Sequence, residues 1–235
     1  MSKTKLKVVR IALIHATRVA IDPVEAAAKE LWPEAELVSI LEEALSMDRA
    51  ANTVPITQIN TRIVDLARYA ERLNPDGILY TCSAFGEGIE EAARTSVLPV
   101  LKPNEAMFDA AFSIGDDIAM IYTFPPSVSS MEKEFREAAV ESGSKAKIRS
   151  VFADGALDAL KRGDATTHNR IVSEVASGID DADAILLAQF STAQAASLVR
   201  EAINTPVLAS PESAIEKMKR CVERSEGSNS SSEQP

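Results

Sequence analysis

The chain contains an internal repeat whose two copies are offset along the sequence by a fixed number of residues. The offset is the one that carries position 76 to position 183. Three apolar segments recur in one register at this spacing: DGILYTC (76–82) with DAILLAQ (183–189), IALIHAT (11–17) with IAMIYTF (118–124), and PVL (99–101) with PVL (206–208). Such agreement indicates two copies of one structural unit. We expect the copies to face each other across a cleft, with equivalent strand ends on its two sides.

Apolar, strand-like runs alternate with helical segments in each copy. The predicted strands are 7–15, 36–40, 77–81, 97–101, 117–122, 148–152, 183–188 and 206–209. Strands separated by helices are typical of parallel sheets with right-handed crossovers. The predicted fold class is therefore α/β, with two pseudo-symmetric lobes, each a parallel sheet flanked by helices, and with the active site between them.

The repeat also suggests how the lobes divide the chain. Residues 1–102 and 211–224 are predicted to form the first α/β lobe, and residues 103–210 the second. The last helix is predicted to end near residue 223. Residues 225–235 (SEGSNSSSEQP) have no apolar side chain to bury, so we predict a disordered tail.

Charge and composition exclude several classes of partner. The net charge of −10 opposes binding to phosphate backbones, so no nucleic-acid partner is expected. No apolar run approaches the roughly 20 residues of a membrane span, and Arg10 and His15 interrupt the N-terminal apolar run, which argues against a signal peptide. Two cysteines, Cys82 and Cys221, form no disulfide framework, so a cytoplasmic protein with reduced thiols is predicted.

Cys82 is the main candidate for chemistry because it lies directly after a predicted strand, where ligands bind in parallel sheets. Backbone amides and a following helix are expected to lower the pKa of its thiol. The thiolate could then remove a proton from carbon or attack carbon. A small buried core residue is the alternative, because free cysteines often serve that purpose.

Gln189 and Ser191 occupy the equivalent turn of the second copy, with Gln189 at the position of Cys82. A glutamine is no base at neutral pH, but it can donate a hydrogen bond to an oxyanion or carboxylate. Gln189 could instead satisfy only the backbone of its own loop. Ser191 is a poor base unless it is activated.

Three further polar residues follow predicted strands. His15 and Thr17 follow the first strand, and His15 could act as an acid/base, contact the substrate or be structural. Thr123 could hold a carboxylate or lie in a helix-capping stretch. The two histidines and two cysteines show no zinc-ligand spacing, so no metal is predicted. Neither GxGxxG nor GxxxxGK[ST] is present, so neither nucleotide-binding fingerprint is found.

Several segments together resemble the aspartate/glutamate/hydantoin racemase superfamily, which includes maleate isomerase and arylmalonate decarboxylase among its relatives. The segments that carry the resemblance are DGILYTCSAFG, PVLKPNEAMFDAA, DAILLAQFSTAQAA and PVLASPESAI. The resemblance covers roughly residues 6–222. It implies an enzyme without a cofactor that acts on a small carboxylate.

The resemblance also assigns roles to residues. Racemases of this superfamily use two cysteines, one from each half, on opposite faces of the reacting carbon. Cys82 matches the first cysteine, whereas Gln189 stands where the second would be, which argues against a two-thiol mechanism. The positions that match the carboxylate-binding turns are Thr17, Ser83, Thr123 and Gln189. The first turn reads His15-Ala16-Thr17 in place of the Asp-Ser pair of glutamate racemases, which argues against amino-acid substrates.

We therefore predict a cofactor-independent racemase or isomerase that acts on a small carboxylic acid through Cys82, by an enolate-like or thiol-adduct intermediate. A decarboxylase of a malonate-type acid is the first alternative, a non-catalytic ligand-binding descendant the second, and a lyase the third. Whether the chain forms a homo-oligomer is left open. The predicted site consists of catalytic residues Cys82 and Gln189 and substrate-binding residues His15, Thr17, Ser83, Thr123 and Ser191.

Overall fold

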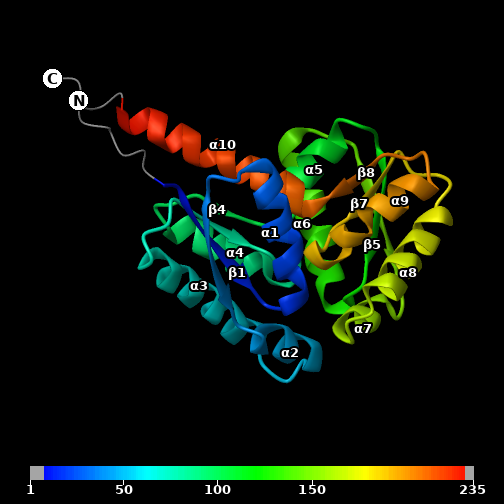
Figure 1. Ribbon diagram of the computed structural model, residues 1–235, viewed down its shortest axis with the longest axis horizontal. Helices are drawn as coiled ribbons and strands as arrows, with labels where there is room; N and C mark the ends of the chain where they lie inside the picture. The colour runs from blue at the N-terminus through cyan, green and yellow to red at the C-terminus, as the bar shows by residue number, and fades with distance from the viewer. Residues whose placement is uncertain (1–7, 231–235) are drawn as a thin grey trace.

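The computed structural model describes residues 8–230 and shows two lobes, each built on a four-stranded parallel sheet (Figure 1). This architecture confirms the predicted fold class. In lobe 1 the strand order is β2-β1-β3-β4, and in lobe 2 it is β6-β5-β7-β8. The strands are β1 (Arg10–His15), β2 (Glu36–Leu41), β3 (Gly77–Tyr80), β4 (Val100–Leu101), β5 (Asp117–Tyr122), β6 (Lys147–Phe152), β7 (Ala184–Leu187) and β8 (Val207–Ala209).

The repeat extends to the pairing of the strands. Ile11 pairs with Gly77 in lobe 1, and Ile118 pairs with Ala184 in lobe 2, so both partners are displaced by the spacing of the sequence repeat. The strand pairs β3–β4 and β7–β8 show the same displacement.

Only β6 departs from the spacing of the repeat. At that spacing Glu36, the first residue of β2, would correspond to Gly143, whereas the structure aligns it with Lys147, the first residue of β6. Lobe 2 therefore has an insertion before β6, and it regains the register of the repeat before β7.

Helices cover both faces of the lobe 1 sheet, because successive side chains of a strand point to opposite faces. Ala12 and Ile14 of β1 face one core cluster, and Ile11 and Leu13 face the other. Helices α3 and α4 bury apolar side chains in the first cluster, and α1 and α10 do so in the second. The helical segments of lobe 1 are η1 (Arg18–Ala20), α1 (Ile21–Leu31), α2 (Ala44–Ala51), α3 (Ile56–Glu71), η2 (Ser83–Phe85), α4 (Gly86–Thr95) and α10 (Ser210–Ser230).

Lobe 2 is covered in the same way. Helices α5 and α6 pack on one face around Phe108 and Phe135. The centroids of these two rings lie 5.2 Å apart in an edge-to-face arrangement. Segments α7, α8, η4 and α9 pack on the other face. The helical segments of lobe 2 are α5 (Glu105–Phe112), η3 (Pro125–Ser127), α6 (Val128–Ser142), α7 (Ala156–Lys161), α8 (Ala165–Ser177), η4 (Phe190–Ala195) and α9 (Ala196–Ala202).

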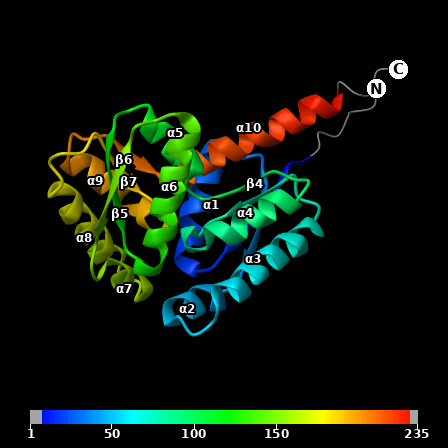
Figure 2. The same cartoon turned by 180° about the vertical axis from the view of Figure 1, so that it is seen from behind.

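Helix α10 follows lobe 2 in the sequence but packs on lobe 1. Met218 and Ile215 are fully buried in the lobe 1 core. The packing is close: a Cβ added at Gly77 in β3 would come within 2.5 Å of Met218 Sδ. The chain therefore passes between the lobes twice, after β4 and after β8, and both lobes contribute to one junction (Figures 1 and 2).

The last helix is longer than predicted. Helix α10 continues to Ser230, so the part of the predicted disordered tail (225–235) that lies within the described residues is helical. A helix anchored by packing extends cheaply, because each added residue costs less than forming a new helical turn. Residues 231–235 lie outside the described part. No helix within residues 8–230 is long and apolar enough to cross a membrane.

Candidate active site

A small cleft lies where the carboxyl ends of the two sheets meet. It encloses about 50 Å³, which is roughly the space of three or four water molecules. Both lobes contribute residues that follow the central strands β1, β3, β5 and β7. The lining residues are Thr17, Val19, Ala20, Ser46, Thr81, Cys82, Ser83, Phe124, Leu157, Lys161, Gln189, Phe190 and Ser191.

The cleft brings together five of the seven residues that the sequence suggested. Thr17, Cys82 and Ser83 line it from lobe 1, and Gln189 and Ser191 line it from lobe 2. The other two, His15 and Thr123, are buried behind this lining and contact residues that belong to it. The strand ends therefore gather as expected, although the turns do not all present their side chains to the cleft.

The Cys82 side chain is partly buried and packs against the core of lobe 1. Burial raises the pKa of the thiol to about 11, and a hydrogen bond from the backbone of Ala84 opposes this shift. The expected lowering of the pKa is therefore wrong. A single amide hydrogen bond cannot offset the loss of hydration around a thiolate in apolar surroundings. The group in the cleft is a protonated thiol at neutral pH.

Gln189 is held by a hydrogen-bond network within lobe 2. Its Oε1 accepts from the backbone N–H and from the hydroxyl of Thr123, both at 2.7 Å. Its Nε2 donates to Ser127 Oγ at 2.9 Å. A side-chain amide has two N–H donors, so one Nε2 hydrogen remains for a ligand. Gln189 is thus a fixed hydrogen-bond donor and no acid/base, and the Thr123 hydroxyl is engaged with Gln189.

His15 supports the turn from beneath. It is fully buried, with Nδ1 2.8 Å from Thr81 Oγ1 and Nε2 3.2 Å from Ser39 Oγ. Burial lowers the pKa of His15 to about 4, so the ring is neutral at physiological pH. His15 does not line the cleft, in contrast to the predicted substrate contact. It fixes Thr81, the residue before Cys82.

Three hydroxyl groups in the cleft have no hydrogen-bond partner among the described residues. They belong to Thr17 and Ser83 of lobe 1 and to Ser191 of lobe 2. Ser83 and Ser191 are buried, where hydroxyls usually find a partner. Their hydroxyls and that of the half-buried Thr17 are therefore available to a bound ligand. Ser46 also lines the cleft, but its hydroxyl donates to the backbone oxygen of Ala16 at 2.5 Å.

Lys161, at the end of α7, is the cationic residue among those that line the cleft. Sequence reasoning missed it because it searched only the turns after strands. The signal is the shifted register of β6: the displacement that places Lys147 on Glu36 also places Lys161 on Ala50 of α2 and Leu157 on Ser46. Helices α2 and α7 are therefore equivalent, and each lines one side of the cleft.

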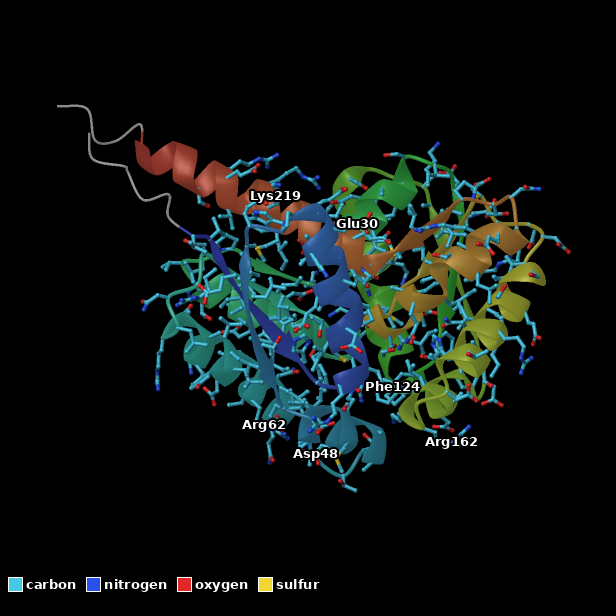
Figure 3. The ribbon with its side chains drawn as sticks, in the orientation of Figure 1. Glu30, Asp48, Arg62, Phe124, Arg162 and Lys219 are labelled. Carbon is cyan, nitrogen blue, oxygen red and sulfur yellow. The ribbon has the colours of Figure 1, made fainter. Side chains whose placement is uncertain are left out.

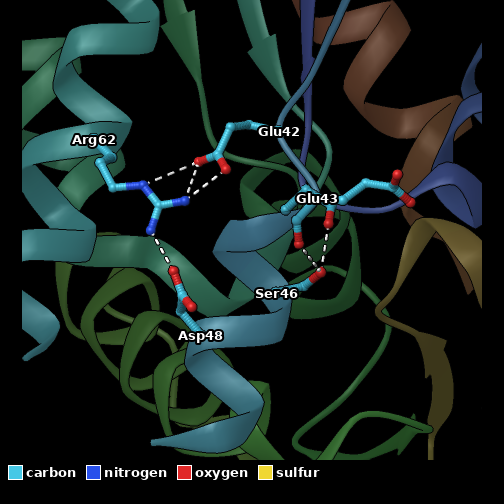
Figure 4. Close-up of polar contacts among 6 residues, drawn as sticks. Glu42, Glu43, Ser46, Asp48 and Arg62 are labelled. Atoms are coloured by element: carbon cyan, nitrogen blue, oxygen red, sulfur yellow. Dashed lines mark hydrogen bonds and ion pairs between the residues drawn. The ribbon is translucent and has the colours of Figure 1, made fainter. Parts of the chain in front are cut away.

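Arg62 of α3 forms ion pairs that hold helix α2 against lobe 1 (Figure 4). The guanidinium contacts both carboxylate oxygens of Glu42 at 2.5 Å and Asp48 Oδ2 at 2.5 Å. Glu42 directly follows β2 and Asp48 lies in α2, so this ion-pair network joins three elements. It holds α2 in the position where Ser46 lines the cleft.

Two aromatic residues of lobe 2 close the cleft from the other side. Phe190 is buried in the core of lobe 1, and Phe124 packs partly buried against it. Figure 3 shows Phe124 at the junction of the lobes. Within residues 8–230, no group of three or more His, Cys, Asp or Glu side chains is arranged to hold a metal ion. The cleft therefore offers one thiol, one cation, free hydroxyls and an apolar wall.

Comparison with known proteins identifies the family and the fold of the chain. The family model for Asp/Glu/Hydantoin racemase matches residues 14–218. No curated protein sequence matches the chain. Among solved structures, a glutamate racemase from Bacillus anthracis superposes with a TM-score of 0.74 at 11% identity, covering 92% of this chain and 82% of that one.

Two further structures share the fold. An allantoin racemase from Klebsiella pneumoniae superposes with a TM-score of 0.71 at 19% identity, covering 92% of this chain and 89% of the other. A variant of arylmalonate decarboxylase superposes with a TM-score of 0.64 at 16% identity, covering 91% and 93%. At these identities the likeness concerns the fold alone.

Proposed function

The chain belongs to the Asp/Glu/Hydantoin racemase family, and we propose that it is a cofactor-independent enzyme that generates an enolate-like intermediate from a small carboxylic acid and protonates it with Cys82. The observation that carries this proposal is the asymmetry of the cleft. A protonated thiol lies on one side, and a glutamine held by Thr123 and Ser127 takes the equivalent place on the other. Proton transfer then occurs from one face only.

The remaining groups of the cleft suit a carboxylate and the charge of an enolate. Lys161 supplies a positive charge from lobe 2. The unpartnered hydroxyls of Thr17, Ser83 and Ser191 and the free N–H of Gln189 can donate to oxygen. Fixed donors of this kind stabilise charge that develops in a transition state, because they need no reorganisation. The substrate is small, since the cleft encloses about 50 Å³.

The raised pKa favours decarboxylation of a malonate-type acid among the reactions open to this site. The bond from the central carbon to one carboxylate breaks, CO₂ leaves, and the electron pair remains on the enolate. The Cys82 S–H then gives its proton to that carbon, and the resulting thiolate takes a proton from water. A thiol whose pKa is about 11 is present in the required form at neutral pH.

Isomerisation or racemisation is the second candidate, and the family supports it. In this reaction Cys82 must first lose its proton, because a thiolate removes a proton from carbon or adds to a double bond. A substrate that excludes water and brings its own hydrogen bonds to the sulfur would be needed to lower the thiol pKa. The two candidates therefore differ in the starting protonation state of one atom.

The test is proton NMR in D₂O with wild-type protein, Cys82→Ala and, as a matched control, Cys221→Ala. The substrates are methylmalonate and other 2-substituted malonates, 2-substituted carboxylates, maleate and hydantoins. We expect a deuterium-labelled monocarboxylate from a malonate, lost with Cys82→Ala and retained with Cys221→Ala. Exchange or isomerisation without loss of CO₂ would favour the second candidate. Saturation-transfer signals from a bound ligand without any reaction would favour a ligand-binding protein and contradict both.

A further inference from the structure

A second pocket lies between the lobes, and the turn after Cys82 contributes to its wall. It encloses about 290 Å³, more than the cleft. Ala84, Phe85 and Gly86 line this pocket, whereas the preceding residues Cys82 and Ser83 line the cleft. One short turn of lobe 1 therefore separates the two cavities.

The pocket contains an unusual concentration of buried polar atoms without hydrogen-bond partners. Six such side-chain atoms occur within the described residues, and four of them belong to this lining: Arg49 Nε, Asn60 Oδ1 and both carboxyl oxygens of Glu134. Glu134 is 4% exposed. Folded proteins rarely leave such groups unsatisfied, because each costs the desolvation of a polar atom. Their convergence on one cavity indicates a ligand that pairs with them.

The neighbouring lysines are already paired with other carboxylates. Lys133 lies 3.4 Å from Glu87 and 3.9 Å from Glu137, and Lys102 lies 3.1 Å from Glu90. Lys102 Nζ also forms an ion pair with Glu134 Oε1 at 3.8 Å, but this separation leaves both carboxyl oxygens of Glu134 without a hydrogen bond. The groups that remain for a ligand are therefore the Arg49 guanidinium, the Asn60 carbonyl and the Glu134 carboxyl.

These three groups define the chemistry of the ligand. Arg49 comes from α2 of lobe 1 and offers a donor with a positive charge. Glu134, from α6 of lobe 2, and Asn60, from α3, offer acceptors. We propose that this pocket binds a small zwitterion, with its ammonium group at Glu134 and Asn60 and its carboxylate at Arg49. Lobe 1 would thereby hold the carboxylate, and both lobes would hold the ammonium group.

The protonation of Glu134 is compatible with such a ligand. Burial raises the pKa of its carboxyl to about 7, against the opposing effect of Lys102. An ammonium group at hydrogen-bond distance would lower this pKa again, because an opposite charge favours the ionised carboxylate. The ligand would therefore supply a second counter-charge at hydrogen-bond distance, closer than Lys102 at 3.8 Å.

The pocket is placed to affect the cleft. Arg49 lies in the same helix as Ser46, which lines the cleft, and α2 is already held at one side by Arg62 (Figure 4). The lobes meet at this place, because the Gly86 amide donates to Ser130 Oγ at 3.3 Å, and α4 and α6 lie side by side in Figure 2. A ligand that joins α2 to α6 would fix helix α2 and the turn after Cys82. This regulatory consequence rests on the proposed function, whereas the binding itself does not.

The test reads binding directly, by chemical-shift changes in ¹⁵N-labelled full-length protein. The probes are glycine, 3-aminopropanoate and 4-aminobutanoate, which vary the spacing of the two charges, together with butanoate and butylammonium, which carry only one. We expect a zwitterion to shift the amides of Gly86, Ser129 and Ser130. We also expect at least tenfold tighter binding than that of either singly charged probe.

The variants Glu134→Gln and Arg49→Gln should each weaken this binding at least tenfold. Glu141→Gln, an exposed residue of the same helix α6 outside the pocket, is the matched control and should leave it unchanged. Thermal unfolding of each variant verifies that the fold is intact. Equal binding by Glu134→Gln and Glu141→Gln would overturn the proposal, as would shifts confined to Thr17, Ser83 and Ser191 or no shift with any zwitterion. None of these outcomes depends on turnover at Cys82.

Discussion

The two lobes share one backbone plan but present opposite chemistries to the cleft. At the spacing of the repeat, Thr17 of lobe 1 corresponds to Phe124 of lobe 2, Cys82 to Gln189, and Ser83 to Phe190. All six line the cleft. Lobe 1 thus contributes two free hydroxyls and the thiol, whereas lobe 2 contributes two aromatic rings and a fixed amide. At these three pairs of positions, the two copies of the unit therefore contribute side chains of different chemistry to one cleft.

The equivalent helices α2 and α7 also carry side chains of different chemistry. Helix α2 of lobe 1 has Ser46 and Ala50 where α7 of lobe 2 has Leu157 and Lys161. The cation therefore comes from the lobe that lacks the thiol. Under the proposed function, the substrate carboxylate lies toward Lys161 and the reacting carbon lies toward Cys82.

Removing the thiol should give the largest effect on turnover and is the most direct test of the difference between the two lobes. We expect Cys82→Ala to lower turnover by about 10³-fold, in the range of a lost general acid. The Gln189→Ala change removes no acid or base, so it should cost less. Turnover of the malonate substrate by NMR provides the measurement. An equal loss in both variants would show that the two turns share the chemistry.

The aromatic side of the cleft should matter more for stability than the hydroxyl side. Phe190 is 1% exposed and inserts into the core of lobe 1, so Phe190→Ala should lower the free energy of unfolding by about 3 to 4 kcal/mol. Its counterpart Ser83 has no hydrogen-bond partner within residues 8–230, and Ser83→Ala should change stability by less than about 1 kcal/mol. Urea unfolding of the two variants tests this difference. Similar losses would contradict the division between the lobes.

The buried His15 should make the stability of lobe 1 depend on pH. The equivalent position in lobe 2 is Tyr122. The pKa of His15 is lowered by burial from 6.5 to about 4. Its stabilising contribution is therefore complete above pH 6.5 and is lost as the pH falls toward 4. The full loss amounts to about 3 kcal/mol.

His15→Gln removes this titration. The stability difference between wild type and His15→Gln should therefore shrink by about 2 to 3 kcal/mol between pH 7.5 and pH 4.5. Urea unfolding at both pH values provides the measurement, and Tyr122→Phe is the control in lobe 2, whose effect should stay constant. A difference that is independent of pH would show that His15 carries no proton-linked stability.

Moving the cation should have the smallest effect on kcat/KM. It tests whether helices α2 and α7 are interchangeable as sources of the charge. Lys161→Met should lower kcat/KM for a carboxylate substrate by about 10-fold, because one charged donor to the substrate is lost. Lys145→Met, at an exposed site away from the cleft, should have no effect. Ala50→Lys in the Lys161→Met background tests whether a cation from lobe 1 can replace it. Full recovery would contradict the assigned orientation of the substrate.

The architecture of the protein can be predicted from its sequence. Its repeat predicted two facing lobes, and the strand ends predicted that Thr17, Cys82, Ser83, Gln189 and Ser191 would meet. These inferences succeed because strand periodicity is a local rule and because parallel sheets follow a general topological rule that gathers the carboxyl ends of their strands. The last helix was underestimated, because helix length depends on the packing that anchors it.

The protonation and hydrogen bonding of these groups follow from the tertiary structure. The Cys82 thiol is protonated because apolar neighbours remove its hydration, Gln189 is engaged by Thr123 and Ser127, and His15 is neutral beneath the turn. Lys161 reaches the cleft because α7 packs at its side, as α2 does in lobe 1. Protonation, hydrogen-bond pairing and the position of a charge depend on neighbours that are distant in sequence, so a pattern along the chain does not contain them.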